Sequence, residues 1–209
     1  MKPNIGSGTL MAAALFVGGT ATPSGAQVGS GWTRVSVSKS KHYGGTWGGH
    51  YSNSGGVERF WIGSGEQRAE IMLSSPKWTS GQWQFEGEVN TKAGSGGSAG
   101  SSVQQIFGIA GRNSDAAQLR VTTANGGTYR TQTDNNPHAT VATGVYGKWL
   151  RINAVHDADA NRIYYYLNGS LKFNGRDGGN ATHYFKYGIY LRAETRPEAS
   201  WRSVKVFRR

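Results

Sequence analysis

The sequence contains no cysteine among its 209 residues. No disulfide can therefore restrain the unfolded chain, and the fold has to be held by its core and its hydrogen bonds. No segment approaches the roughly 18 uninterrupted apolar residues of a membrane-spanning helix. Acidic residues are also scarce, because 12 Asp and Glu stand against 23 Lys and Arg and give a net charge of +11. A positive field of this size attracts polyanions.

The positive charge leaves three interpretations open. Inside a cell the usual polyanion is nucleic acid, and outside a cell uronate or sulfated polysaccharides are at least as common as ligands. A basic surface can also serve solubility alone. The net charge therefore predicts that a ligand is negatively charged, but it does not predict the chemical class of that ligand.

The first 26 residues have the layout of a secretory signal peptide. Lys2 precedes an apolar run from Thr9 to Val17, and small residues follow up to Ala26. We expect cleavage after Ala26 and a single domain over residues 27–209. Export without cysteine is typical of bacteria, so the sequence predicts a secreted protein, extracellular or periplasmic. Outside the cell an acidic polysaccharide is the expected partner, and we expect a monomer that binds neither nucleic acid nor membrane.

Alternation of apolar and polar residues runs through the remaining chain, and no stretch has a convincing helical period. This pattern predicts an all-β fold, and turn sequences such as Asn168-Gly169 separate the strands. Many short strands at this spacing are typical of a β-jelly roll sandwich, concanavalin A-like, made of two antiparallel sheets. The expected strands are Trp32 to Ser38, Val57 to Ile62, Gln67 to Leu73, Gln82 to Thr91, Val103 to Ala110, Ala117 to Thr123, Lys148 to Val155, Arg162 to Leu167, His183 to Ala193 and Ser200 to Phe207.

A tract rich in Gly and Ser, from Ala93 to Ser102, has no side chains that could fill a core. We expect a flexible surface loop there, either a flap over a binding groove or a plain connection between two strands.

A possible calcium loop begins at Asp157-Ala158-Asp159-Ala160-Asn161. Arg162 stands where such a loop needs Gly, and Asn168 stands where it needs a bidentate Glu. We interpret the segment as a hairpin turn and expect neither a metal nor a cofactor.

Three segments place polar and cationic side chains on one face of their strands, because alternate residues of a strand face opposite sides. Cations and amides can hold carboxylates, and aromatic rings can stack on sugar rings, so such a face suits an acidic sugar. A solvated outer sheet with incidental cross-strand pairs is the alternative. The residues on this face are Arg68 and Glu70, then Gln105 and Phe107, then Tyr184, Lys186, Tyr190 and Arg192.

The same three segments carry a family resemblance. Arg68-Ala69-Glu70-Ile71, Gln105-Ile106-Phe107 and Tyr184-Phe185-Lys186-Tyr187-Gly188-Ile189-Tyr190 resemble, in this order, the sequence blocks of the jelly-roll alginate lyases of polysaccharide lyase family 7. The closing Trp201-Arg202-Ser203-Val204 is similar to the last strand of that clan, which includes the glucuronan lyases of family 20. The resemblance runs from about Val57 to the end and implies a concave substrate groove.

The resemblance also implies a reaction, the β-elimination of a polyuronate, glucuronan or alginate-like, which leaves an unsaturated sugar at the new non-reducing end. Tyr190 matches the catalytic tyrosine, Gln105 the amide that helps to neutralise the substrate carboxylate, and Arg68 and Lys186 substrate-contacting cations. Phe107 departs from the pattern, because the alginate lyases usually have His there. This departure leaves the base unassigned and keeps open a lectin-like module that binds acidic polysaccharide without cutting it.

Two replacements for the missing base are open. Tyr190 can act as base as well as acid if Lys186, Arg192 or Arg68 favours its phenolate, or a histidine from elsewhere in the chain can take the role. His42, His50 and His138 lie in expected loops that can overhang the sheet, and we select His50. His156 and His183 have the wrong strand parity and are expected to be structural. The remaining residues expected to contact substrate are Tyr184, Glu70, Arg192 and Trp47, the last in a Gly-rich loop.

Overall fold

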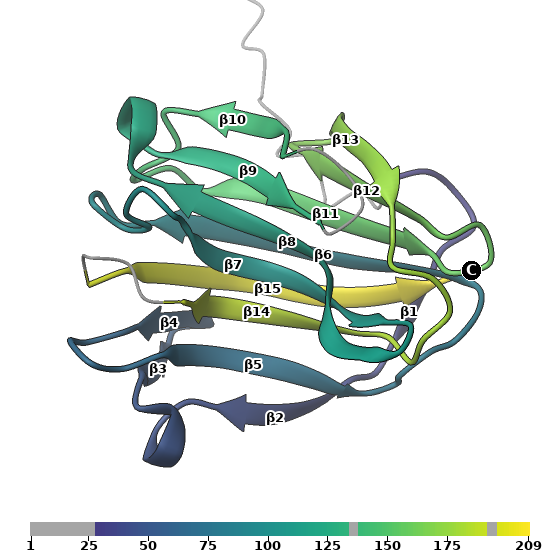
Figure 1. The fold of residues 1–209 in the computed structure, drawn as a ribbon, viewed down its shortest axis with the longest axis horizontal. Helices are drawn as coiled ribbons and strands as arrows, with labels where there is room; N and C mark the ends of the chain where they lie inside the picture. Colours follow the sequence, from purple (N-terminus) through teal and green to yellow (C-terminus); the bar gives the residue numbers. More distant parts are fainter. Residues whose placement is uncertain (1–27, 134–137, 192–195) are drawn as a thin grey trace, which may run out of the picture.

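The computed structural model describes residues 28–133, 138–191 and 196–209, so the expected signal peptide lies outside the described residues. Two antiparallel sheets pack against each other (Figure 1). One sheet has the order β13-β12-β11-β6-β15-β4-β3, with β1 also paired to β15, and the other has the order β10-β9-β8-β7-β14-β5-β2. The predicted all-β jelly-roll sandwich is confirmed.

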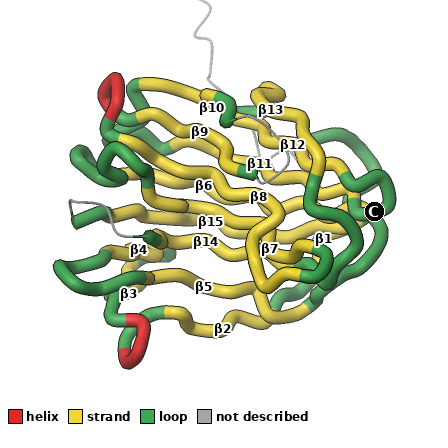
Figure 2. Tube along the Cα trace, in the orientation of Figure 1, coloured by secondary structure: helices red, strands yellow, loops and turns green. Residues whose placement is uncertain are grey.

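Short irregular segments join the strands, and the tube drawing shows how little helix the fold contains (Figure 2). The described residues include the 3-10 turns η1 (Gly45–Trp47) and η2 (Ala124–Gly126) and no helix that could cross a membrane. The strands are β1 (Thr33–Val35), β2 (Ser38–His42), β3 (His50–Ser54), β4 (Val57–Trp61), β5 (Arg68–Ser75), β6 (Gln82–Thr91), β7 (Ser101–Ile109), β8 (Arg112–Thr122), β9 (Thr128–Gln132), β10 (Thr140–Thr143), β11 (Leu150–Asp157), β12 (Arg162–Leu167), β13 (Ser170–Arg176), β14 (Tyr184–Tyr190) and β15 (Glu198–Arg208).

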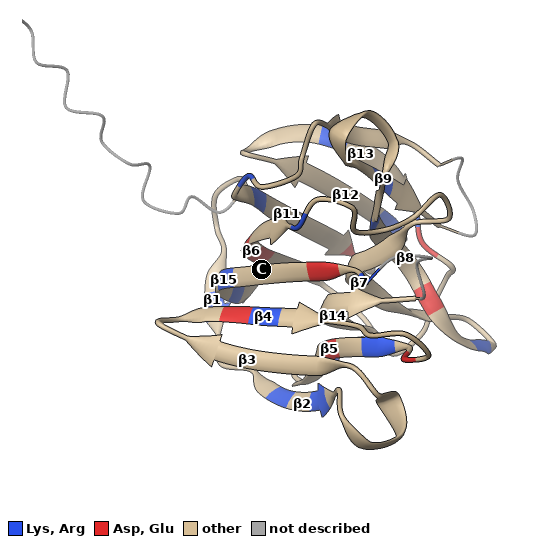
Figure 3. Ribbon diagram, turned by 90° about the vertical axis from the view of Figure 1, so that its left-hand side faces the viewer, with Lys and Arg blue, Asp and Glu red and all other residues tan. Residues whose placement is uncertain are grey.

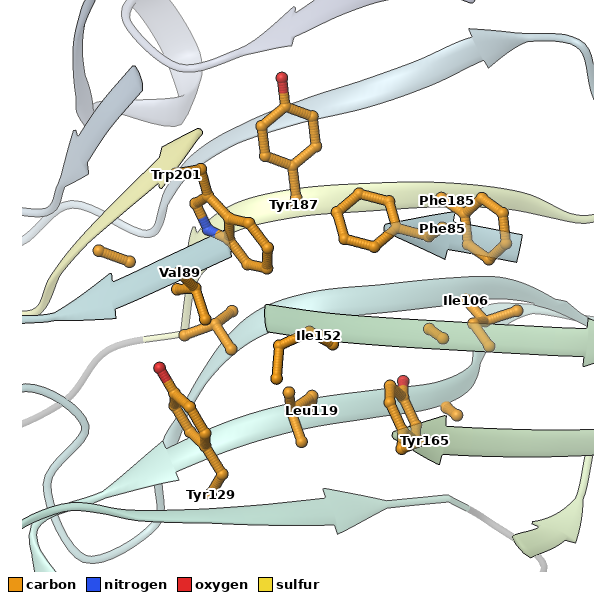
Figure 4. Close-up of a cluster of buried hydrophobic side chains, with 14 of the residues drawn as sticks. Phe85, Val89, Ile106, Leu119, Tyr129, Ile152, Tyr165, Phe185, Tyr187 and Trp201 are labelled. Carbon is orange, nitrogen blue, oxygen red and sulfur yellow. The ribbon is translucent and has the colours of Figure 1, made fainter. Parts of the chain in front are cut away.

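The core lies between the two sheets and is filled by the inward-facing residues of both. Phe85 and Trp201 come from one sheet and Phe185 and Tyr187 from the other, and all four are fully buried (Figure 4). Their rings meet at centroid distances of 5.5 to 5.9 Å in tilted or edge-on contacts, a favourable geometry for aromatic pairs. Because the core takes one face of each strand of the β14 sheet, the other face is left for a ligand.

The Gly- and Ser-rich tract is a loop between β6 and β7, as expected, but part of it is buried. Ser95 is buried, and its Oγ donates to the carbonyl of Glu198 at 3.1 Å and accepts from the Glu198 N–H at 2.9 Å. A Cβ at Gly96 would stand 2.1 Å from the carbonyl oxygen of Val121. The missing side chains thus allow the tract to lie against β8, and the hydrogen bonds of Ser95 hold it to the start of β15.

Candidate active site

Strand β14 lies between β5 and β7, and its register brings together the residues that the sequence placed on one face. Tyr190 lies opposite Arg68 on β5, and Lys186 lies between Met72 on β5 and Gln105 on β7. Arg68, Lys186 and Tyr190 line one groove with a volume of about 540 Å³. Trp47 and Tyr184 line the same groove, as the sequence predicted.

A glycine, Gly188, lies on β14 between Lys186 and Tyr190. Gly188 has a φ of +138°, and a Cβ there would approach the carbonyl oxygen of Ala69 to 2.4 Å. The pairing of β14 with β7 shifts register between Tyr187 and Tyr190 at the same place. Glycine is therefore required by the close approach of β5.

Arg68 is held by contacts with three neighbouring side chains. Its Nε lies 3.1 Å from Oε2 of Glu70. Its guanidinium carbon lies 4.0 Å from the ring centroid of Tyr190 and 4.9 Å from that of Trp47. Two cation–π contacts and one ion pair thus orient a guanidinium on the groove wall, where it can meet an anion.

The floor beneath the groove contains buried polar groups. Glu70 and Gln105 are fully buried, and Lys186 is 3% exposed. The amide nitrogen of Gln105 donates to Glu70. Burial raises the pKa of Glu70 to about 7, although the positive charges of Lys186 and Arg68 act in the opposite direction. Burial also lowers the pKa of Lys186, against the attraction of Glu70 and Asp115.

Phe107 has a visible role in place of the histidine that the alginate lyases carry. Its ring stacks on Tyr184 at 4.9 Å, and Nζ of Lys186 lies 4.2 Å from its centroid. The ring therefore holds the ammonium group of Lys186 in the groove but supplies no base.

His42 is the histidine that the structure brings into the groove. It ends β2 opposite Glu70, lines the groove, and stacks on Trp47 at a centroid distance of 5.3 Å. Burial lowers its pKa to about 4, with smaller contributions from the positive charges of Lys186 and Arg68. Its imidazole is therefore neutral at pH 7 and can accept a proton. Among the described residues, its buried Nδ1 has no hydrogen-bond partner.

The selection of His50 was wrong in position. His50 begins β3 in the other sheet, where its ring stacks on Trp61 at 5.1 Å and its Nε2 lies 3.0 Å from Glu66. Sequence reasoning missed β2, because Ser38–His42 has no apolar alternation. The available signal was the pair Lys39 and Lys41, since alternate lysines are typical of a protected edge strand and put His42 on the opposite face.

Three further predicted residues need correction or fall outside the structure. Glu70 is buried in an ion pair with Arg68 and does not line the groove, so it positions that arginine. Gln105 lies beneath the groove, with its amide on Glu70, and its direct contact with a carboxylate stays a prediction. Arg192 lies outside the described residues.

Basic residues lie on strands of both sheets, including β2, β4 and β5 (Figure 3). Two of those in the sheet opposite the groove meet carboxylates: Arg59 pairs with Glu198 at 2.6 Å and Arg202 with Glu88 at 2.5 Å. The net charge alone thus does not locate a site, and the groove is identified by its shape and its buried polar floor.

Apart from the groove, a buried cluster contains three residues of types that bind metals: His156, Asp177 and His183. Trp78 donates its indole N–H to Nδ1 of His156 at 2.9 Å, so the ring hydrogen stands on Nε2, which lies 2.7 Å from Asp177. Both nitrogens of His156 are thus used within the protein, and a metal at Nε2 would have to displace that hydrogen. The prediction that His156 and His183 are structural agrees with their burial, at 0% and 1% exposure.

Comparison with known proteins adds a relative. No family model matches the chain. The citrate-binding protein of Hevea brasiliensis is 32% identical over 171 residues, which cover 76% of this chain and 67% of that protein. The chain belongs to the family of that protein. The family of the citrate-binding protein thus includes a chain that folds as the two-sheet sandwich described above.

Solved structures of alginate lyases share the fold. The family 7 enzyme of Zobellia galactanivorans has a TM-score of 0.64 at 15% identity and covers 80% of this chain and 83% of its own. The Pseudomonas aeruginosa enzyme has a TM-score of 0.63 at 16% identity, over 80% and 88% of the two chains. The jelly roll implied by the resemblance is therefore confirmed, whereas the likeness to glucuronan lyases stays a prediction.

Proposed function

We propose that the protein is a polysaccharide lyase that cuts an acidic polyuronate, glucuronan or alginate-like, by β-elimination. The observation that supports this most is the convergence of Arg68, Lys186, Tyr190 and a neutral His42 on one groove. The N-terminal sequence adds to the proposal that the enzyme is exported and meets its substrate outside the cytoplasm.

The reaction begins with the carboxylate of the sugar to be cut. Arg68 and Lys186 bind it from the groove wall and stabilise the charge that develops on it as the C5 proton leaves. Glu70 and Gln105 act beneath them, since Glu70 pairs with Arg68 and Gln105 donates to Glu70. These contacts hold the cationic wall in position before the substrate arrives.

His42 takes the C5 proton, and Tyr190 gives its hydroxyl proton to O4 as the C4–O4 bond breaks. The electron pair of the C5–H bond becomes the C4=C5 double bond of the product. A substrate carboxylate between Arg68 and Lys186 offsets two positive charges that lower the pKa of His42. Binding of substrate thereby raises the pKa of His42 toward its ordinary value and makes it a stronger base.

The test is the ultraviolet absorbance of the new double bond when the protein is mixed with glucuronan, polymannuronate and polyguluronate. Replacing Tyr190→Phe is expected to lower the rate by a factor on the order of 10² to 10⁴, because the acid is lost. Tyr164→Phe on β12, in the other sheet, is the matched control and should keep the rate. A wild-type protein that produces no absorbance on any of the three polymers would overturn the proposal.

A second candidate is a protein that binds carboxylate ligands in this groove without cutting them. The relative named for citrate binding favours it, since Arg68 and Lys186 can also hold a small polycarboxylate. A lectin-like module for acidic polysaccharide belongs to the same alternative. Calorimetry with citrate and with polyuronates separates the cases, because a binder gives heat without product and Tyr190→Phe then leaves its affinity nearly unchanged.

A further inference from the structure

A row of side chains crosses the groove sheet at the level of Tyr190. The register pairs Arg68 with Tyr190, Tyr190 with Ser102, Ser102 with Arg120, and Arg120 with Arg130. Since paired strands lie about 4.8 Å apart, the Cα atom of Arg120 is about 14 Å from that of Arg68, three strands away along this row. A second basic pair thus lies on the far side of Tyr190 from the cations of the candidate active site.

The surface is hollowed along the same row. Arg120, Tyr190 and Leu191 line two depressions of about 430 and 250 Å³. The smaller depression shares Ser114, Asp115 and Tyr190 with the groove of the candidate active site. The three spaces therefore meet around Tyr190 and can hold one continuous chain.

The two arginines of this row are held by neutral groups. Nε of Arg120 donates to Oε1 of Gln118 at 2.7 Å, and Arg130 donates to Nδ1 of His138 at 2.6 Å. Burial lowers the pKa of His138, with smaller effects from Arg130 and Arg120, so its nitrogen can accept this bond. Within residues 28–133, 138–191 and 196–209, neither arginine has a carboxylate within ion-pair distance. The charge of Asp115, which lines the smaller depression with Arg120, acts on that arginine from beyond ion-pair distance. Arg68 differs, because its Nε lies 3.1 Å from Glu70.

We propose that Arg120 and Arg130 form a second acid-group subsite, which takes an acid group farther along the polymer that Arg68 and Lys186 hold. This inference rests on the proposed function and sharpens its substrate class. The ligand is a chain with acid groups on both sides of Tyr190, long enough to span about 14 Å. Simultaneous contact at two places favours long chains over short ones without any change at the site of cleavage.

The experiment compares a long polyuronate with its shortest cleavable oligomer. Arg120→Gln and Arg130→Gln are each expected to raise the KM for the polymer roughly tenfold more than the KM for the oligomer, because a charge-assisted hydrogen bond is lost. Lys172→Gln is the matched control, because it removes the same positive charge. Lys172 is exposed on β13, in the sheet opposite the groove. Urea unfolding of each variant checks that the fold is kept, and Arg130→Gln serves if Arg120→Gln does not fold.

Affinity electrophoresis in gels that contain the polymer separates two kinds of failure. Wild-type protein that neither cuts nor is retarded by any polyuronate overturns the proposed function. Wild-type protein that is retarded, with both arginine variants retarded equally, overturns the second subsite alone. The second subsite is also overturned if the arginine variants change KM equally for polymer and oligomer. The same holds if Lys172→Gln changes KM as much as the arginine variants do.

Discussion

Two polar clusters of this protein differ in how completely the ring nitrogens of one histidine in each are hydrogen-bonded. In the chain Trp78–His156–Asp177, both ring nitrogens of His156 have partners, at 2.9 and 2.7 Å. Nδ1 of His42, in the groove, is buried without a partner among the described residues, and so are Oε1 of Gln105 beneath the groove and Nδ1 of His183 beside His156. Buried polar groups are rarely left unpaired, and an unpaired one costs stability. His156 therefore serves the fold, whereas the unpaired His42 in the groove is arranged for a ligand.

Charge distinguishes the two clusters as well. The groove buries Glu70 and Lys186 close to Arg68, at a cost in desolvation that packing with apolar side chains would avoid. The presence of Glu70 and Lys186 at the centre of a sheet therefore indicates a role other than stabilising the fold. Substituting a histidine in the groove should therefore change stability less than substituting His156 in the chain Trp78–His156–Asp177.

The largest effect is expected for His156→Phe. The change keeps an aromatic ring but leaves the indole N–H of Trp78 buried without its acceptor. It also removes the contact of His156 with Asp177, which keeps the N–H of Gly179. We expect the free energy of unfolding to fall by about 3 kcal/mol or more, measured by urea denaturation. His50→Phe is the control, because the half-exposed His50 should change stability by less than about 0.5 kcal/mol. Equal losses in the two variants would remove the distinction between the clusters.

The next effect is a loss of rate without a loss of fold. His42→Ala should lower the rate of double-bond formation roughly 100-fold, because the base is lost. The unfolding free energy should change by less than about 1 kcal/mol, since the buried Nδ1 has no hydrogen bond to lose. His50→Ala should keep the wild-type rate. A His42→Ala protein that cuts at the wild-type rate would show that Tyr190 acts without this base.

The pH profile refines the same prediction. The pKa of His42 is about 4 in the free protein, so kcat/KM should fall as the pH drops through about 4 and the base becomes protonated. The acid limb of kcat should lie at higher pH, because bound substrate offsets the charges of Arg68 and Lys186. Coincident limbs in the two profiles would contradict the substrate-dependent pKa.

The smallest expected effect concerns stability and pH at Glu70. Burial raises its pKa from 4.5 to about 7, so between these values the folded protein binds its proton more tightly than the unfolded chain does. Stability from this group is therefore fully present below pH 4.5 and is lost as the pH rises through about 7. Glu70→Gln should reduce this loss, and its stability relative to wild type should increase by roughly 2 kcal/mol between pH 5 and pH 8. Equal urea midpoint shifts with pH in the two proteins would contradict it.

Part of the site could be predicted because strand alternation is local. Arg68, Lys186 and Tyr190 were placed on one face from the spacing of their neighbours alone, and they line one groove. His42 could not be found in this way, since its strand has no apolar face and is recognised by its pairing with β5. The burial of Gln105 was also out of reach, because it depends on which strands cover it.

By itself, the sequence determined the all-β class and the face on which each side chain of a strand lies, because backbone geometry repeats every two residues. Only the tertiary structure decided that β14 lies between β5 and β7, that β2 brings His42 to the groove, and that Arg120 shares a row with Tyr190. The lateral order of strands follows from contacts between distant segments, which no local pattern encodes. The pKa values of Glu70 and His42 depend on that order, since burial and neighbouring charges set them.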